Sequence, residues 1–478
     1  MQQLTGLDAS FLYLETANTP MHISSVVIYD PSTAPNGKVR FKEILKNTEA
    51  RSCRVPSMTN VLVNVPMSLD HPYWRTEGSF DAEFHIRHMA LPAPGDWRQL
   101  CILIARLHAR PLDRSRPLWE MYIIEGLDNV EGCPKGSFAV FNKVHHAAVD
   151  GASSAQIAVA IHDLSPDYAV AKKDVVVIKP EKAPSSWDLI VKSQINSIKK
   201  PFRFLSVARN TIPGVARTIA GLTTGKLERI TNIPRTRFSG TISPHRIFDA
   251  ATFDFQEIRK IKNSVAGATV NDVALAICGG ALRKYLAHHD ELPEESLVAM
   301  APVNLRTEDQ SGTGGNQVTQ MTVALCSDIE DAYERLEAVH EGTANAKQLT
   351  NAIGAKAMTD YNQFIPATLT ASAARLASSW GLANKIKPAY NCVITNVPGP
   401  QIPLYYTGAR MVNSYGLGPP LDGNGLFHVI SSYCGQLNVS VTSCREMMPD
   451  PAFYVECIEE SFNELKEAAL IHTKESSA

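Results

Sequence analysis

Two spacings of apolar residues alternate along the first 165 residues. Strand-like runs, rich in β-branched and aromatic residues, lie at 84–88, 118–124 and 137–144. Two other stretches, at about 96–109 and about 153–164, place apolar residues three and four positions apart, as one face of a helix requires. Strands that alternate with helices predict a layered α/β domain.

The same alternation returns after residue 240. The pattern Thr269-x-x-Asp272 is a capping signature that predicts a helix running to about His288, and a second helix is expected at about 328–348. Asp450-Pro451 predicts the N-cap and first turn of a final helix. The apolar stripe of that helix comprises Tyr454, Ile458, Phe462 and Leu465. Strand-like runs lie near 389–395, 427–433 and 436–442.

A charged stretch with two prolines, at 172–184, separates the two patterns and is typical of an exposed linker. The stretch that follows, 189–248, carries eleven basic residues against one acid, Glu228, with apolar residues between them. The basic residues are Lys192, Lys199, Lys200, Arg203, Arg209, Arg217, Lys226, Arg229, Arg235, Arg237 and Arg246. We therefore expect three parts: an α/β domain at 1–185, a basic amphipathic linker at 186–240 and a second α/β domain at 241–478.

Composition fits a folded globular protein and excludes several other classes. Of the 478 residues, 44% are hydrophobic and 20% charged, which is an ordinary balance for globular proteins. The net charge is −2, so the near-neutral total conceals a basic segment of about +10 and a remainder of about −12. This overall charge does not support a nucleic-acid partner.

The cysteines and the apolar runs predict a protein of the reducing cytoplasm. The nine cysteines lie far apart and form no Cys-x-x-Cys pair, which disfavours a zinc ribbon, a thioredoxin motif or a secreted disulfide scaffold. The sequence starting at Met1 has neither a basic stretch nor an apolar core, so a secretory signal is not expected. The longest apolar run, 273–282, covers about half a membrane span.

The strongest chemical signal is His145-His146-x-x-x-Asp150-Gly151, where a predicted strand ends before a helix. It combines two imidazoles, a carboxylate and a glycine that permits a tight turn. Three interpretations compete: a metal site, histidines with a purely structural role, and a general base. A metal site lacks a His-Glu-x-x-His motif and a further ligand cluster, so no metal is expected. Two adjacent histidines before Asp-Gly favour a general base that deprotonates a hydroxyl or an amine.

This motif resembles the HHxxxDG motif of the CoA-dependent acyltransferase superfamily, which includes chloramphenicol acetyltransferases, peptide-synthetase condensation domains and wax ester synthases. Other motifs resemble, in the same order, the bacterial wax ester synthase/acyl-CoA:diacylglycerol acyltransferase family. They are Leu7–Phe11, Pro20–His22, Leu91–Gly95, Pro111–Glu120 with its Pro117-Leu118-Trp119, Asn271–Val273, Pro302–Arg306 and Asn396–Pro400. One departure is Asn304, where many relatives carry Ser.

The resemblance implies two chloramphenicol-acetyltransferase-like α/β domains with an active-site tunnel between them. It implies transfer of a long-chain acyl group from acyl-CoA to a fatty alcohol, giving a wax ester, or to diacylglycerol, giving triacylglycerol. His146 would act as general base, a task that the ordinary imidazole pKa near 6.5 suits. No covalent acyl-enzyme is expected, because no Gly-x-Ser-x-Gly elbow is present. Acyl-CoA would be a co-substrate, with no other cofactor.

The remaining site residues receive supporting roles. His145 is expected to shape the site, and Asp150 to pair with Arg306 and hold the loop that turns at Gly151. Asn271 would donate a hydrogen bond to the developing oxyanion. The neighbouring Asp272 is expected to be a helix cap. Pro117, Leu118 and Trp119 are expected to be structural, with the large ring in the core.

Two other functions stay open at this point, a free-standing condensation domain and a non-catalytic lipid-binding protein of the same fold. The basic segment 189–248 is expected to bring a cytoplasmic enzyme, monomeric or homodimeric, to the inner membrane surface or to lipid inclusions. Attraction of the phosphates of CoA and a merely solvated linker are the alternatives for that segment.

Overall fold

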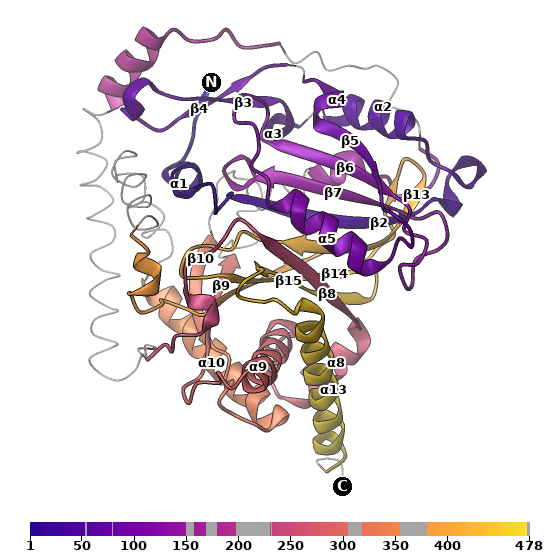
Figure 1. Ribbon diagram of the computed structural model, residues 1–478, viewed down its shortest axis with the longest axis vertical. Helices are drawn as coiled ribbons and strands as arrows, with labels where there is room; N and C mark the ends of the chain where they lie inside the picture. Colours follow the sequence, from indigo (N-terminus) through magenta and orange to yellow (C-terminus); the bar gives the residue numbers. More distant parts are fainter. Residues whose placement is uncertain are drawn as a thin grey trace.

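The computed structural model describes residues 1–52, 55–78, 80–149, 157–168, 179–196, 230, 232–304, 318–353 and 380–475. Two six-stranded sheets dominate this part of the chain, one above the other in Figure 1, and a three-stranded sheet lies at the N-terminal end. The small sheet has the order β1 (Gln2–Gln3), β4 (Tyr73–Thr76), β3 (Asn60–Val63).

The first large sheet has the order β12-β13-β2-β7-β6-β5. Its strands are β2 (His22–Asp30), β5 (Ile86–Ala90), β6 (Trp119–Glu125), β7 (Phe138–His145), β12 (Tyr405–Tyr406) and β13 (Ala409–Leu417). Only the β5–β6 pair in this sheet is parallel, and the other pairs are antiparallel. Strand β7 is therefore a central strand, with main-chain partners on both edges.

Helices cover both faces of this sheet. On one face α5 (Trp97–His108) begins at Asp96, whose side chain accepts from the Gln99 amide, and buries Leu100, Ile104 and Leu107. This three- and four-residue spacing is what the sequence predicted for the helix. The other face carries α2 (Phe41–Ser52), α3 (Pro56–Thr59) and α4 (Ala82–His85). Helix α1 (Gly6–Leu14) lies beside the end of β7.

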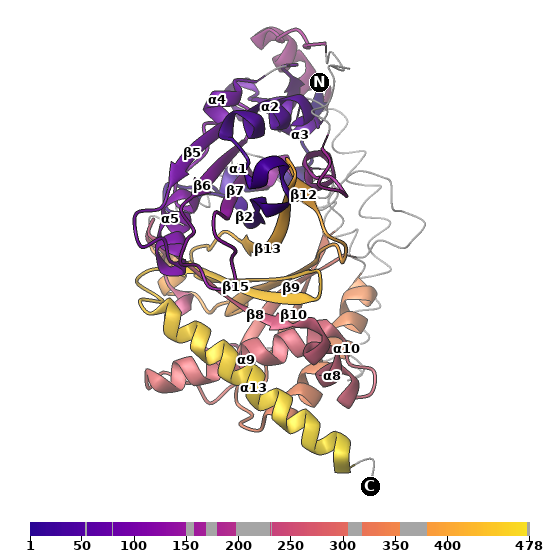
Figure 2. The same cartoon turned by 90° about the vertical axis from the view of Figure 1, so that its right-hand side faces the viewer.

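The second large sheet has the order β10-β9-β11-β14-β15-β8, and four helices cover its outer face (Figures 1 and 2). Its strands are β8 (Arg246–Asp254), β9 (Val298–Asn304), β10 (Val318–Ala324), β11 (Cys392–Pro398), β14 (Leu426–Tyr433) and β15 (Gln436–Cys444). The helices are α8 (Phe255–Ser264), α9 (Val270–His288), α10 (Ala332–Ile353) and α13 (Pro451–Glu475). The predicted stripe of α13 is confirmed: Tyr454, Ile458, Phe462 and Leu465 are all buried.

The late hairpin β12–β13 leaves the second half of the chain and completes the first sheet. Its inner face packs on the second sheet, where Asn413 and Asn438 exchange side-chain hydrogen bonds of 3.1 and 2.6 Å. Gly416 is required here, because a Cβ at this position would lie 2.5 Å from a methyl carbon of Val429. The expected division of the chain at residues 185 and 241 stays a prediction. The first large sheet, however, contains strands from both halves of the sequence, because β12 and β13 belong to it.

Several predicted boundaries shift. The strand expected at 84–88 is wrong in its first half, because Asp81 caps the short helix α4 and the strand begins only at Ile86. Helix α10 starts at Ala332, later than expected, and β11 starts at Cys392. Residues 157–161 are helical as predicted, whereas the expected start of that helix lies outside the described residues.

Helices of the described residues include none that is long and apolar enough to cross a membrane. The eight described cysteines are free thiols.

Six histidines have pKa values lowered by burial, which makes the folded protein sensitive to acid. They are His22, His85, His108, His146, His162 and His428. Below about pH 6.5 the unfolded chain binds protons at these positions that the folded protein does not, so stability falls as pH falls. The loss continues toward the folded pKa values, about 3 for His108 and about 4 for His428.

We predict that the free energy of unfolding falls between pH 6.5 and 5 by up to about 1.4 kcal/mol per pH unit for each such histidine. Urea titrations at several pH values measure this slope. His428→Gln should reduce the slope by up to one proton, because it removes one of these buried imidazoles. Stability that stays constant between pH 7 and 5 would contradict the prediction.

Candidate active site

The two histidines of the motif lie where β7 ends, and the main chain there is held from both sides. The His145 amide donates to the Leu118 carbonyl at 2.9 Å, and the His146 amide donates to the Met21 carbonyl at 2.9 Å. His145 is the last residue of β7 and pairs with His22, the first residue of β2. The backbone therefore fixes where both imidazoles project.

His145 is buried and fully engaged inside the protein. Its Nδ1 accepts from the Ala147 amide at 3.0 Å, which assigns the ring proton to Nε2. That Nε2 donates to Oε2 of Glu15 at 2.7 Å. Both nitrogens of His145 are thus engaged within the protein, and its expected role of shaping the site stays a prediction.

Glu15 directly follows helix α1 and is a site residue that sequence reasoning missed. Besides His145, it contacts Arg114, whose guanidinium lies 2.9 Å from Oε1, and the Met21 amide at 3.2 Å. Burial alone would raise the pKa of this carboxyl, but the hydrogen bond from His145 and the charges around it hold the pKa below its ordinary value. Glu15 therefore stays ionised and links α1, the strand end and Arg114.

His146 opens a short 3₁₀ turn, His146–Ala148, and is held quite differently. The Phe11 ring of α1 stacks on its imidazole, with ring centroids 3.9 Å apart and planes 18° apart. Its Nδ1 is buried and has no partner on another residue of the described chain, and the ring interacts with the carbonyl of His146 itself. In its uncharged form an imidazole keeps a free electron pair on one ring nitrogen, and that nitrogen can accept a proton.

Burial lowers the pKa of His146 to about 4, with a smaller contribution from His145, while its own carbonyl raises it. This differs from the expectation of an ordinary pKa near 6.5, because the sequence does not show how far folding buries the ring. At neutral pH the imidazole is uncharged, which is the form that accepts a proton. The two neighbouring histidines therefore differ: the imidazole of His146 is able to accept a proton, whereas both nitrogens of His145 are engaged within the protein.

The Pro117-Leu118-Trp119 segment, which leads into β6, packs beside these two histidines. Leu118 packs with Ala147 and with the α1 residues Ala9 and Leu12, while its carbonyl accepts from His145. The buried Trp119 donates from Nε1 to the Met58 carbonyl at 2.9 Å.

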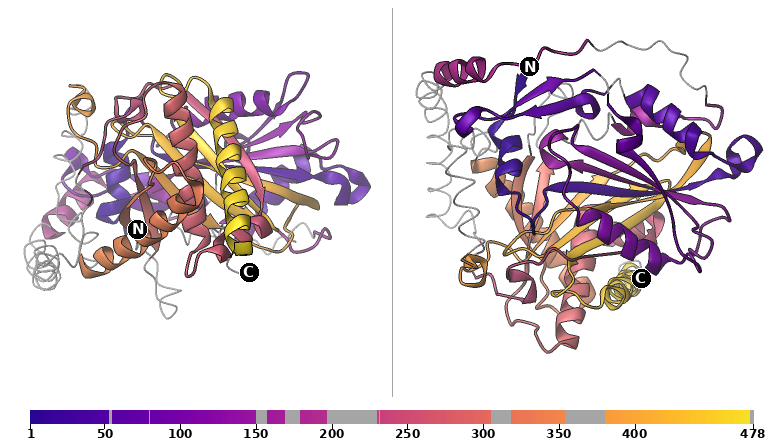
Figure 3. Two further views of the ribbon diagram at one scale, coloured as in Figure 1. Left: turned by 90° about the horizontal axis from the view of Figure 1, so that it is seen from below. Right: turned by 45° about the horizontal axis from the view of Figure 1, so that its top comes forward.

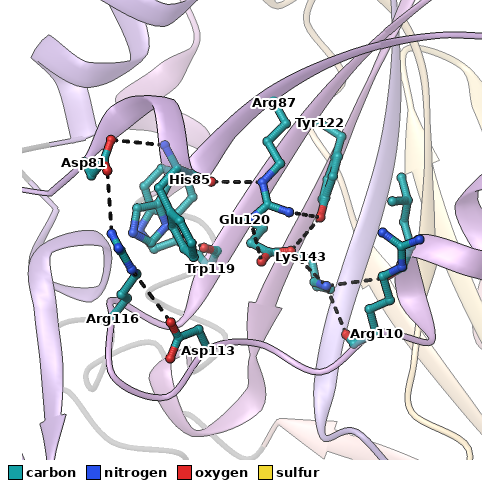
Figure 4. A network of polar contacts seen from close by, with 12 residues as sticks. Asp81, His85, Arg87, Arg110, Asp113, Arg116, Trp119, Glu120, Tyr122 and Lys143 are labelled. Atoms are coloured by element: carbon teal, nitrogen blue, oxygen red, sulfur yellow. Dashed lines mark hydrogen bonds and ion pairs between the residues drawn. The ribbon is translucent and has the colours of Figure 1, made fainter.

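Behind the strand end lies a buried ionic network, drawn in Figure 4. Lys143 of β7 is fully buried, and its ammonium lies 3.0 Å from Glu120 and donates to the Arg110 carbonyl at 3.0 Å. Glu120 also accepts from Tyr122 at 2.7 Å and faces Arg87. Removing one partner from such a network leaves a charge buried and unpaired, which is costly. The network therefore holds β6 and β7 in one register just before His145.

The second half of the chain contributes the start of α9. Asp272 caps the helix as predicted. The Thr269 amide donates to its Oδ2, and its own amide donates to the Thr269 side chain. Its Oδ2 also contacts Nδ1 of His340 at 3.0 Å. Asn271, beside it, is only partly buried, and its Oδ1 accepts from Asn396 of β11 at 3.4 Å. This contact leaves the Asn271 amide nitrogen free to donate elsewhere.

Other predicted residues cannot be placed. Asp150, Gly151 and Arg306 lie outside the described residues, so their expected pairing and turn remain predictions. The described residues contain no group of three or more side chains that could hold a metal ion.

We predict that Glu15→Ala lowers stability by about 1–3 kcal/mol, because it leaves the His145 Nε2–H and Arg114 without their buried partner. Glu15→Gln should cost less, since its amide oxygen can still accept. Urea unfolding measures both, with the exposed Glu49→Ala as the control. If Glu15→Ala unfolds at the same urea concentration as the wild type, the link is unimportant for the strand end.

Comparison with known families gives two matches along the chain. Residues 4–274 match the model of the wax ester synthase/diacylglycerol acyltransferase catalytic domain, and residues 314–466 match the C-terminal domain of the same family. A Mycobacterium tuberculosis protein that carries the name diacylglycerol O-acyltransferase is 33% identical over 472 residues, covering 98% of this chain and 91% of the relative. An O-acyltransferase of Acinetobacter baylyi is 30% identical, covering 94% and 93%.

Solved structures agree. The wax ester synthase/diacylglycerol acyltransferase of Marinobacter aquaeolei has a TM-score of 0.67 at 27% identity, covering 98% of this chain and 100% of that one. The starter condensation domain of rhizomide synthetase, at 11% identity, shares the fold alone, with a TM-score of 0.54 and coverage of 98% and 94%. The predicted α/β class and the predicted resemblance are both confirmed. The chain belongs to the wax ester synthase/diacylglycerol acyltransferase family.

Proposed function

We propose that this protein transfers a long-chain acyl group from acyl-CoA to the hydroxyl of a fatty alcohol or of diacylglycerol. Membership of the family supports the reaction class. The observation that carries the proposal is the state of His146: a partly buried, uncharged imidazole that stacks on the Phe11 ring directly after the end of β7. Such a group can accept a proton from a neutral hydroxyl.

The proposed reaction needs one base and two substrates. Nε2 of His146 takes the hydroxyl proton as the oxygen attacks the thioester carbon, and a tetrahedral intermediate forms. Its collapse breaks the carbon–sulfur bond, and the CoA thiolate takes the proton back from the imidazolium. The ester and free CoA are the products, His146 is restored, and no acyl group is attached to the protein.

Asn271 is the proposed donor to the oxyanion of that intermediate. Its place in the first turn of α9 supports this role, because the N-terminal end of a helix favours negative charge. Its amide nitrogen is free to donate, since Asn396 occupies the oxygen side of the amide. We propose that both substrates reach this point through a tunnel between the two halves, with Asp150 and Arg306 holding the loop after His146.

The enzyme is also proposed to work at a lipid surface, because both acceptors and the product partition into lipid. The basic segment 189–248 supports this, but not with all its charges. Arg235 and Arg246 donate to main-chain carbonyls, and Arg237 forms two hydrogen bonds with Glu291. These three arginines stabilise the folded protein. Any attraction of this segment to anionic lipid therefore comes from its other basic residues.

His146→Ala should lose most of its turnover, because removal of a general base commonly costs about 10²–10⁴-fold. His145→Ala should lose less, since it acts through position. Release of CoA from palmitoyl-CoA with hexadecanol measures both, with circular dichroism as a check of folding. A folded His146→Ala protein that turns over near the wild-type rate would refute the proposed base.

The pH dependence of kcat/KM tests the state of His146 separately. The base form predominates above its folded pKa of about 4, so kcat/KM should stay level from pH 7 to about pH 5 and fall only below that. Because stability also falls in acid, each rate is taken on protein shown to be folded at that pH. An acidic limb centred near pH 6.5 would show that the imidazole is in ordinary contact with water.

A further inference from the structure

A helix at 186–196 is firmly attached to the small N-terminal sheet by one face. Ser185 and Asp188 cap its start with reciprocal hydrogen bonds of 3.0 and 3.1 Å. Leu189 is buried against Val65 and Tyr73. On the same side, Asn196 donates to Asp70 at 2.8 Å. The orientation of this helix is therefore fixed by packing and hydrogen bonds, and so is the direction in which its other face points.

That other face is apolar and open to solvent. Trp187, Val191 and Ile195, spaced four residues apart along one side of the helix, are 72%, 43% and 46% exposed. The neighbouring turn carries Met67, 84% exposed, and Leu69, 40% exposed. Helix and turn lie together at one end of the molecule (Figures 1 and 3). Exposed apolar side chains gathered in this way mark an interaction surface.

The charges around this surface are mainly positive. Lys179, Lys182 and Lys192 are exposed, while Asp188 is used in the helix cap and Glu181 pairs with the N-terminal amine. An apolar stripe beside lysines is complementary to a lipid surface, which has an apolar interior and anionic headgroups. A second copy of the chain would instead bring like charges together.

We propose that Trp187, Val191 and Ile195, together with Met67 and Leu69, form the surface that this protein inserts into anionic lipid. Tryptophan suits the role, because its amphipathic ring partitions to the headgroup level. The contact is peripheral, since the opposite face of the helix stays packed on the protein. This inference rests on the proposed function in one respect: binding to lipid would bring the active site to its lipid substrates. The binding itself needs no catalysis.

Sedimentation with vesicles of phosphatidylcholine and phosphatidylglycerol tests the surface. The double variant Trp187→Ser with Ile195→Ser should bind at least about tenfold more weakly than the wild type. The control is Leu470→Ser with Ile471→Ser, which removes two apolar side chains that are 46% and 57% exposed near the C-terminal end of α13. The control should bind like the wild type. Equal binding by all three proteins overturns the proposal.

Fluorescence gives an independent reading on the wild-type protein. Vesicles should shift the tryptophan emission to shorter wavelength, and Trp187→Phe should abolish most of that shift. A shift that persists in Trp187→Phe overturns the insertion of this ring. An assembly state that changes in the double variant, with vesicle binding intact, would assign the surface to a second copy instead and equally overturn the proposal.

Turnover on detergent-dispersed substrate separates this inference from the proposed function. The double variant should keep the wild-type rate there, because Trp187 and Ile195 are exposed and take no part in the stacking of Phe11 on His146. A wild type that binds vesicles through this surface but transfers no acyl group would refute the proposed function and leave the lipid surface standing. A double variant inactive in detergent would show that the change acts on the fold rather than on lipid binding.

Discussion

The chemistry of this protein depends on the register of one central strand. Strand β7 pairs with β2 on one edge and β6 on the other, and its last residues keep those bonds: His145 to Leu118 and His146 to Met21. Because side chains alternate between the faces of a sheet, a slip by one residue would turn His145 and Lys143 to the opposite face. Three neighbouring side chains make such a slip costly: Glu120 for Lys143, Glu15 for His145, and Phe11 for His146.

Burial then sets the chemical state of the two histidines. In the folded protein the two ring nitrogens of His145 form hydrogen bonds with Ala147 and Glu15 in place of water, and these bonds fix the position of the ring. The Nδ1 of His146 is buried without a partner on another described residue, and burial of the ring lowers its pKa. The consequence is a base that is uncharged at neutral pH and a protein that loses stability in acid. Both properties have one cause, the removal of imidazoles from water.

Much of the fold could be predicted because its signals are local. The capping pattern of Thr269 and Asp272 and the apolar stripe of α13 are each contained within a few turns of helix, and both are confirmed. The α/β class and the family follow in the same way from short motifs. The domain boundaries and the placement of Asp150 stay predictions.

What could not be predicted depends on contacts between distant parts of the chain. Glu15 meets His145 across 130 residues, and nothing near Glu15 in the sequence marks it as a partner. The hairpin β12–β13 crosses to the first sheet by pairing with β2, which its own alternation does not reveal. The lowered pKa of His146 likewise comes from burial in the folded protein, where Phe11 of α1 stacks on its ring. The sequence also does not show that Arg235, Arg237 and Arg246 form hydrogen bonds within the protein, because the charge of their segment suggests only a lipid-binding role.

The central claim is that His146 activates the acceptor hydroxyl, so that the acyl group passes directly between the two substrates. Rapid-quench measurement of CoA release from palmitoyl-CoA, with and without acceptor, tests this most directly. The account predicts no rapid CoA release without acceptor, and release together with ester formation once hexadecanol or a diacylglycerol is added. A burst of CoA equal to the enzyme concentration in the absence of any acceptor would reveal an acyl-enzyme and contradict the account.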